Sequence, residues 1–243
     1  MMKRISTLSL FVLVCLPLGA RASLIQGVLN FTGTANISLG TIAFEDNTFN
    51  INSPANTQQG GFTLLQGTTG DIQNITNPPD ATGPVVPPTG VPDFITFNDP
   101  TFSNISITFT FLDPGIDAAA GCLSSPPAGG QQCTPNFPAP SPFNLQNTSA
   151  TSSTASFNIL GIEVDSTTGD TIPITGAFTT PFSNESFQSL LGTVLAGGTV
   201  TTAFSAEFST APLTPEPSTV VELMLGIGAI AMGLLFRKRS QRI

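Results

Sequence analysis

Two cysteines and a scattering of carboxylates are the side chains between the two ends of this chain that could carry chemistry. Cys122 and Cys133 have ten residues between them, and the 243-residue chain contains no His. Two thiolates are too few for a structural zinc site, which takes roughly four Cys or His ligands. The spacing therefore predicts a disulfide, the form that cysteines take in oxidising compartments. In the chain-entropy account, such a bridge stabilises the fold by a little under 3 kcal/mol, roughly.

The carboxylates show no catalytic pairing. A glycosidase needs two carboxylates that face each other across a cleft, and no spacing singles out such a pair among Asp113, Asp117, Glu163, Asp165 and Asp170. We therefore predict no catalytic residue, no enzyme activity and no cofactor. Calcium, which prefers oxygen ligands, is the alternative use of these acids. Its weak candidates are Asp165 and Asp170, in a stretch that does not match an EF-hand loop, and secondarily Asp113 and Asp117.

Every positive side chain lies in the two ends of the chain. The seven Lys and Arg residues occupy positions 3, 4, 21, 237, 238, 239 and 242, and thirteen of the fifteen acids lie in the body, residues 23–213. Because the body has no cation to neutralise phosphates, nucleic-acid binding is excluded. Because it has no imidazole, Ser-His-Asp and Cys-His catalysis are excluded as well. A body charge of −13 keeps a protein soluble by self-repulsion and discourages sticking to anionic polysaccharide.

The aromatic residues disfavour a sugar-binding face. All nineteen are Phe, with no Trp or Tyr. Sugar-binding modules usually stack pyranose rings on Trp or Tyr, whose polar edge tolerates a wet surface, whereas Phe belongs in cores. Carbohydrate binding is therefore the less favoured alternative.

The first 22 residues have the features of an export signal. Lys3 and Arg4 precede the apolar run 8–18, and Ala20-Arg21-Ala22 forms an A-x-A cleavage site before Ser23. The run is too short to cross a bilayer, which takes roughly 20 residues. We expect signal peptidase to cut after Ala22.

The other end carries a second membrane element, residues 214–243. The run 220–236 is apolar except for Glu222, and its length is at the low end for a spanning helix, about 17 to 25 residues. The cluster of Arg237, Lys238 and Arg239 would hold that end in the cytoplasm. A plain C-terminal anchor is the alternative that these residues leave open.

The order of parts in this tail resembles a known sorting signal. Pro215-Glu216-Pro217, a short spacer, one apolar helix and a basic cluster together resemble the PEP-CTERM signal of Gram-negative bacteria. The resemblance implies that Pro215, Glu216 and Pro217 are the recognition motif and that Arg237, Lys238 and Arg239 are the retention cluster. It also implies transient anchoring in the inner membrane, cleavage by an exosortase-like enzyme and passage of the body to the cell surface. It covers about 30 residues and implies nothing about the body.

Alternation of apolar and polar residues predicts strands along the body. The clearest case is Ile105–Phe111, and the other expected strands are 24–32, 37–44, 61–65, 93–97, 155–164, 172–178 and 200–208. A slip in the apolar phase at Leu160-Gly161 indicates a bulge, and a similar slip occurs near Gly40.

One segment has the helical period instead. An apolar stripe predicts a short amphipathic helix, with Ser183 or Asn184 as N-cap, formed by Phe187, Leu190, Leu191, Val194 and Leu195. We expect this helix to plug one end of the fold or to cross between sheets.

Two Pro-rich segments, 74–92 and 113–142, are predicted to be loops. The second encloses both cysteines, and a bridge would make it a defined projection and the first choice for a contact surface. A floppy insertion held by one bridge is the equal alternative.

These patterns predict an all-β body, a two-sheet, jelly-roll-like β-sandwich with one short helix. The leading functional hypothesis is an exported, non-enzymatic cell-surface or matrix protein, associated with exopolysaccharide. The alternative is a module that binds a surface glycan or protein through segment 113–142, with calcium as an option. A carboxylate-dependent hydrolase is third.

Overall fold

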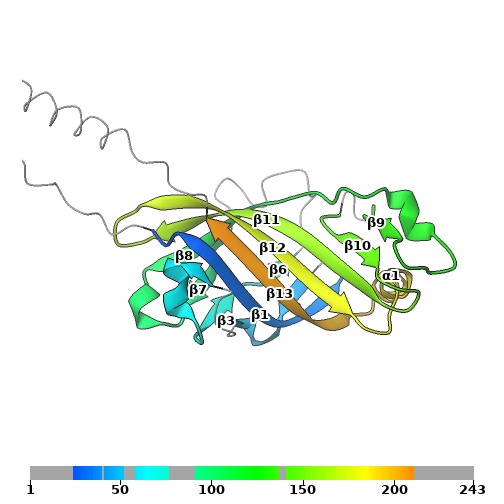
Figure 1. Ribbon diagram of the computed structural model, residues 1–243, viewed down its shortest axis with the longest axis horizontal. Helices are drawn as coiled ribbons and strands as arrows, with labels where there is room; N and C mark the ends of the chain where they lie inside the picture. Colours follow the sequence, from blue (N-terminus) through cyan, green and yellow to red (C-terminus); the bar gives the residue numbers. More distant parts are fainter. Residues whose placement is uncertain (1–23, 40, 52–57, 77–90, 137–140, 211–243) are drawn as a thin grey trace, which may run out of the picture. The chain divides into compact units, whose positions relative to one another are not determined.

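The computed structural model describes residues 24–39, 41–51, 58–76, 91–136 and 141–210 (Figure 1). The strands in these ranges are β1 (Gly27–Ser38), β2 (Thr41–Phe44), β3 (Thr48–Ile51), β4 (Gln59–Gly60), β5 (Thr69–Ile72), β6 (Ile75–Thr76), β7 (Val91–Phe97), β8 (Ile105–Leu112), β9 (Gln132–Cys133), β10 (Asn144–Asn147), β11 (Ser153–Asp165), β12 (Thr171–Phe182) and β13 (Val200–Thr210). The helices are α1 (Phe187–Leu195) and the 3-10 helices η1 (Glu45–Asn47), η2 (Gly61–Leu65), η3 (Pro100–Phe102) and η4 (Ala119–Leu123).

Eight of the strands close into an antiparallel barrel in chain order. Each strand of the ring pairs with the next, and the last pairs with the first, in the order β1, β3, β5, β7, β8, β11, β12 and β13. The ring is therefore an up-and-down barrel with no free edge between its first and last strands.

The predicted two-sheet β-sandwich is wrong. Alternation shows only that each strand has one buried and one exposed face, and sandwiches and barrels both meet that condition. Closure decides between them, and here Val28–Ile37 of β1 pairs with Val200–Ser209 of β13. Because that pairing joins the two ends of the body, no local pattern of residues can reveal it.

The short strands outside the ring lengthen the sheet at particular places. β2 and β4 pair with β1, and β6 pairs with β2. β10 pairs with residues 153–156 of β11, while β8 pairs with residues 159–165 along the same edge, and β9 adds to β10. β11 thus extends past the ring, and β9, β10 and α1 lie together at that end (Figure 1).

Phenylalanine fills the barrel. Phe31 lies at the centre of the core, with ring centroids 4.3 Å from Phe49, 5.4 Å from Phe208 and 6.0 Å from Phe178. All four side chains are at most 1% exposed. Tilted and edge-on rings at such distances are favourable arrangements, so the interior is a packed core.

The bulge expected at Leu160-Gly161 is present, but its extra residue belongs to the neighbouring strand. The register between β11 and β8 shifts at this point, because Leu160 pairs with Phe111 and Gly161 with Phe109. Thr110 of β8 is therefore the unpaired residue, and its hydroxyl donates to the Leu160 carbonyl at 3.1 Å. β11 keeps its alternation throughout, so its odd-numbered residues stay buried from Ser153 to Asp165.

Three other local predictions need correction. Residues 61–65 form η2 rather than a strand. Its buried residues Phe62 and Leu65 are three positions apart, the repeat of a 3-10 helix, and Leu64 is exposed. Segment 37–44 is not one strand, because β1 ends at Ser38 and β2 starts at Thr41 and pairs back onto it. Helix α1 occurs at its predicted place, but its N-cap is Ser186, whose hydroxyl accepts from the Ser189 N–H.

Several predictions fall on residues outside the described ranges. They concern the leader 1–22, Gly40, most of loop 74–92, and the tail with its apolar run 220–236. Within the ranges that the structure does describe, no helix is both long enough and apolar enough to cross a membrane.

Candidate functional site

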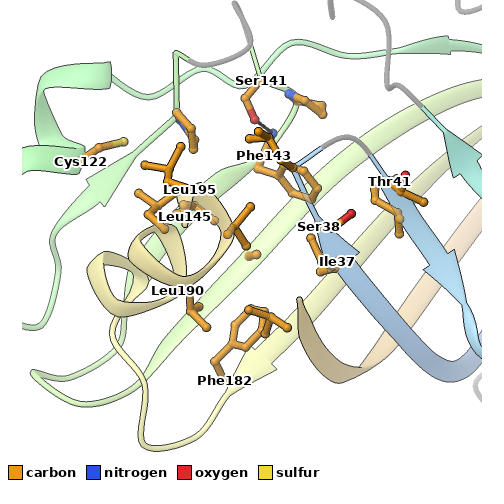
Figure 2. Close-up of a pocket in the computed structure, with 18 of the residues that line it drawn as sticks. Ile37, Ser38, Thr41, Cys122, Ser141, Phe143, Leu145, Phe182, Leu190 and Leu195 are labelled. Carbon is orange, nitrogen blue, oxygen red and sulfur yellow. Dashed lines mark hydrogen bonds between the residues drawn. The ribbon is translucent and has the colours of Figure 1, made fainter. Parts of the chain in front are cut away.

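An apolar groove of about 210 Å³ lies at the end of the barrel that carries α1 (Figure 2). Ile37 of β1 and Phe182 of β12 come from the ring, Leu145 comes from β10, and Leu191 and Leu195 come from α1. Figure 2 shows the helical side chains facing the end of β1 across the cavity. The groove therefore forms where the ring ends and the extension begins.

Helix α1 is fixed as one wall by a buried amide network. Asn147 is fully buried, and its Oδ1 accepts from the Phe187 N–H at 2.9 Å. The Gln188 side chain accepts from Asn147 Nδ2 at 2.9 Å and donates to Gln131 Oε1 at 2.8 Å and to the Ser124 carbonyl at 3.0 Å. These bonds join the helix to β10 and to the loop that carries the cysteines.

The helical stripe predicted from the sequence divides between two roles. Phe187 and Leu190 are buried in a small second core, which also contains Cys133 and Phe182. Leu190 also lines the groove, together with Leu191, Val194 and Leu195, and Leu195 is 57% exposed.

The predicted disulfide is confirmed, and Cys122 is one of the residues that line the groove. Cys122 and Cys133 are bridged with their Cα atoms 5.1 Å apart. The Thr134 hydroxyl accepts from the Asp117 N–H at 3.0 Å and lies 3.2 Å from Asn144 Oδ1, so it joins the loop to β10. Segment 113–142, predicted as a contact surface, thus supplies Cys122 and other lining residues to the groove.

The lining gives the groove its chemistry. Among the described residues that line it, none is charged, and its polar side chains belong to Ser38, Thr41, Asn136 and Ser141. An apolar cavity of roughly 150 Å³ can bind benzene, so this groove has room for one ring or the end of an alkyl chain. The sequence did not predict Ile37 and Phe182 as site residues: Ile37 begins the expected strand 37–44, and Phe182 lies outside every predicted element.

Glu163 is a second unusual feature, because it is an acidic residue buried near the C-terminal end of β11. It is 0% exposed, and its cross-strand partners are Ile107 of β8 and Ile172 of β12. Its Oε1 accepts from the Ile25 N–H at 2.7 Å, while its Oε2 has no partner among the described residues. Burial raises the pKa of Glu163 to about 7. The Ile25 hydrogen bond opposes this rise, and the charge of Asp165 adds to it.

The calcium candidates are used by the local fold. Asp165 Oδ1 accepts from Asn104 Nδ2 and the Thr167 N–H, both at 2.8 Å, and these hydrogen bonds lower its pKa. Asp170 lies in the same β11–β12 connection, where its carbonyl accepts from the Asp165 N–H. In the described part of the chain, no three His, Cys, Asp or Glu residues gather as metal ligands would.

The described Phe residues offer no stacking face for a sugar. Each of them is buried or half-buried, and none stands among the exposed large apolar side chains.

The predicted sorting residues lie outside the described ranges: Ala20, Ala22 and Ser23 at the leader, and Pro215, Glu216, Pro217, Arg237, Lys238 and Arg239 in the tail. Comparisons of the chain with known protein families, curated proteins and solved structures found no match.

Proposed function

We propose that this chain is an exported, non-enzymatic protein of the cell surface or matrix whose barrel binds an uncharged alkyl ligand in the groove beside α1. The observation that carries the proposal is the groove itself, a cavity of about 210 Å³ without a charged side chain among its described lining residues. Burial of apolar surface is the main source of affinity in such sites.

The charge of the body selects the ligand class. With no Lys, Arg or His and a formal charge of −13, the body has no side-chain cation to pair with a carboxylate or phosphate head group. Such a head group would also be repelled by the acids. An alkyl chain with an uncharged head group, such as an alcohol or an ester, needs no cation for pairing and is not repelled by the acids.

The export part of the proposal rests on the two ends of the sequence. The leader directs the chain across the inner membrane, signal peptidase removes residues 1–22, and the tail holds the body at that membrane. An exosortase-like enzyme then cuts near Pro215, Glu216 and Pro217, and the body passes to the surface or matrix. The support is the tail's resemblance to PEP-CTERM signals and the confinement of all Lys and Arg to the two ends.

The ligand class is tested with the uncharged fluorescent probe N-phenyl-1-naphthylamine, added to the processed protein recovered from the cell exterior. We expect saturable binding that decanol displaces and that decanoate displaces at least about tenfold less well. Replacing Val194 and Leu195 together by Gln should abolish saturable binding, because both side chains line the groove.

The matched control is Leu64→Gln, which changes an apolar side chain that is 69% exposed and lies on η2, away from the groove. It should bind the probe as the wild type does. Equal binding by the groove variant and the wild type would show that the probe sits elsewhere and would refute the proposal.

A further inference from the structure

Exposed apolar side chains gather at the end of the barrel that carries α1. Six large apolar side chains are exposed in the described part of the chain, and four of them belong to this end: Leu39, Ile116, Leu123 and Leu195. We name these four residues the apolar patch. Leu39 and Leu195 also line the groove. Exposed apolar side chains that gather in one place mark a site that binds a protein or a membrane.

The other two residues of the apolar patch are held beside the groove. Leu123 directly follows the lining residue Cys122 on η4, which contacts α1. The Ile116 N–H donates to Asn144 Oδ1 of β10 at 2.8 Å, and both sequence neighbours of Asn144 line the groove. Ile116 and Leu123 are 89% and 86% exposed, so almost the whole surface of each side chain faces solvent.

The parts of the chain that form this end carry no charge. Three stretches, 22–44, 118–162 and 186–206, contain no Asp, Glu, Lys or Arg. They hold every described lining residue of the groove except Phe182. Burying a charge in an apolar phase is costly, and these stretches can approach such a phase without burying one.

The charge of the body decides which partner an apolar patch of this kind can have. Two bodies that each carry a formal charge of −13 repel each other, which disfavours a second copy. An anionic surface is repelled in the same way, and Asp117 and Glu185, which directly precede two of the uncharged stretches, add to this repulsion. A lipid surface with zwitterionic or uncharged head groups has no net charge and admits apolar side chains.

We propose that the apolar patch docks the barrel on a lipid surface with zwitterionic or uncharged head groups, so that the groove opens onto the lipid that supplies its alkyl ligand. Ile116, Leu123 and Leu195 enter the apolar layer. Because Leu39 and Leu195 belong both to the patch and to the groove, docking brings the groove to the same surface. The transfer of a ligand rests on the proposed function, whereas docking itself requires only the patch.

Co-sedimentation of the processed protein with phosphatidylcholine vesicles tests the docking. We expect the wild type to bind, and Ile116→Gln plus Leu123→Gln to bind at least about tenfold more weakly, because two apolar side chains no longer leave water. Both side chains are exposed, so the double variant keeps its core. The matched control is Leu64→Gln, on η2 and away from the groove, which should bind as the wild type does.

The charge of the vesicle gives a second measurement. Replacing a third of the phosphatidylcholine by phosphatidylglycerol should weaken binding of the wild type at low salt by at least about threefold. Added salt should reduce this difference, because it screens the repulsion. Tighter binding to the anionic vesicles would overturn the proposal.

The outcomes separate docking from ligand binding. Equal vesicle binding by the wild type and by the double variant, or none by the wild type, overturns docking. A wild-type dimer that the double variant loses, measured by size-exclusion chromatography with light scattering, would assign the patch to a second copy and also overturn it.

The double variant should still bind N-phenyl-1-naphthylamine, because neither Ile116 nor Leu123 lines the groove. Saturable probe binding without vesicle binding therefore refutes docking and leaves the proposed ligand site intact. Vesicle binding through the patch without saturable probe binding supports docking and refutes the ligand site.

Discussion

At the scale of single residues, the burial of Glu163 depends on a register shift between two strands that the sequence does not reveal. A slip in the apolar phase at Leu160-Gly161 is visible in the sequence, but the sequence does not show which strand carries the extra residue. Because Thr110 of β8 is the unpaired residue, β11 keeps its phase and Glu163 turns inward. From the sequence alone, Glu163 is therefore expected to be exposed to solvent, and only the pairing with β8 shows that it is buried.

The buried carboxyl of Glu163 predicts an unusual pH dependence of the free energy of unfolding. The folded state holds the Glu163 proton up to pH about 7, and the unfolded state releases it near 4.5. Since the folded state binds more protons between these values, the free energy of unfolding should fall as the pH rises through this window. The loss should be on the order of 3 kcal/mol.

Urea denaturation at pH 5, 6, 7 and 8 measures this slope, with Glu163→Gln as the control that lacks it. The same slope in both proteins would assign the effect to another group. Asp165 acts elsewhere: its lowered pKa contributes stability above its ordinary value of 3.8, which is lost as the pH falls below that value.

At the scale of elements, periodicity predicted the helix well and the capping residue poorly. The stripe from Phe187 to Leu195 coincides with α1, since one face must pack against the barrel end. Ser183, Asn184 and Ser186 can all serve as caps by type. Ser186 is chosen because the chain forms a turn at Ser183 and Asn184 before the helix begins.

The cap assignment makes a simple prediction. Ser186→Ala should lower the free energy of unfolding by about 1 kcal/mol, because the Ser189 N–H loses its acceptor. Ser183→Ala should change it by less than about 0.5 kcal/mol. Urea denaturation of the two variants decides, and a larger loss in Ser183→Ala would contradict the assignment.

The disulfide predicts a coupled effect on stability and on the groove. Replacing Cys122 and Cys133 together by Ala should lower the free energy of unfolding by a little under 3 kcal/mol, roughly. Saturable binding of N-phenyl-1-naphthylamine should weaken too, because Cys122 and its neighbours in segment 113–142 form a rim of the groove. Unchanged probe affinity in this variant would show that the rim does not depend on the bridge.

At the scale of the whole molecule, strand positions were largely predictable and the architecture was not. Alternation located most of the ring strands, including Ile105–Leu112 and Ser153–Asp165. The barrel depends on the pairing of β1 with β13, which is non-local. The groove depends on segments far apart in the chain that meet at one end. The sequence indicated one of them, segment 113–142, as a contact surface, and it located helix α1 without giving it a binding role.

The distribution of charge along the chain supports the proposed export. A Phe-filled barrel without Lys, Arg or His stands between two ends that hold all seven Lys and Arg residues of the chain. If both ends are targeting signals, the working protein carries acids and one α-ammonium as its charged groups, apart from the carboxylate left at its cut end. This account links the composition of the body to the proposed preference for an uncharged ligand.

Intact-mass spectrometry of the protein recovered from the washed cell surface and matrix tests this account most directly. We predict a chain that begins at Ser23 and ends close to Pro215, Glu216 and Pro217, without the cluster of Arg237, Lys238 and Arg239. Recovery of the chain mainly from the inner membrane, with that cluster still attached, would contradict the account.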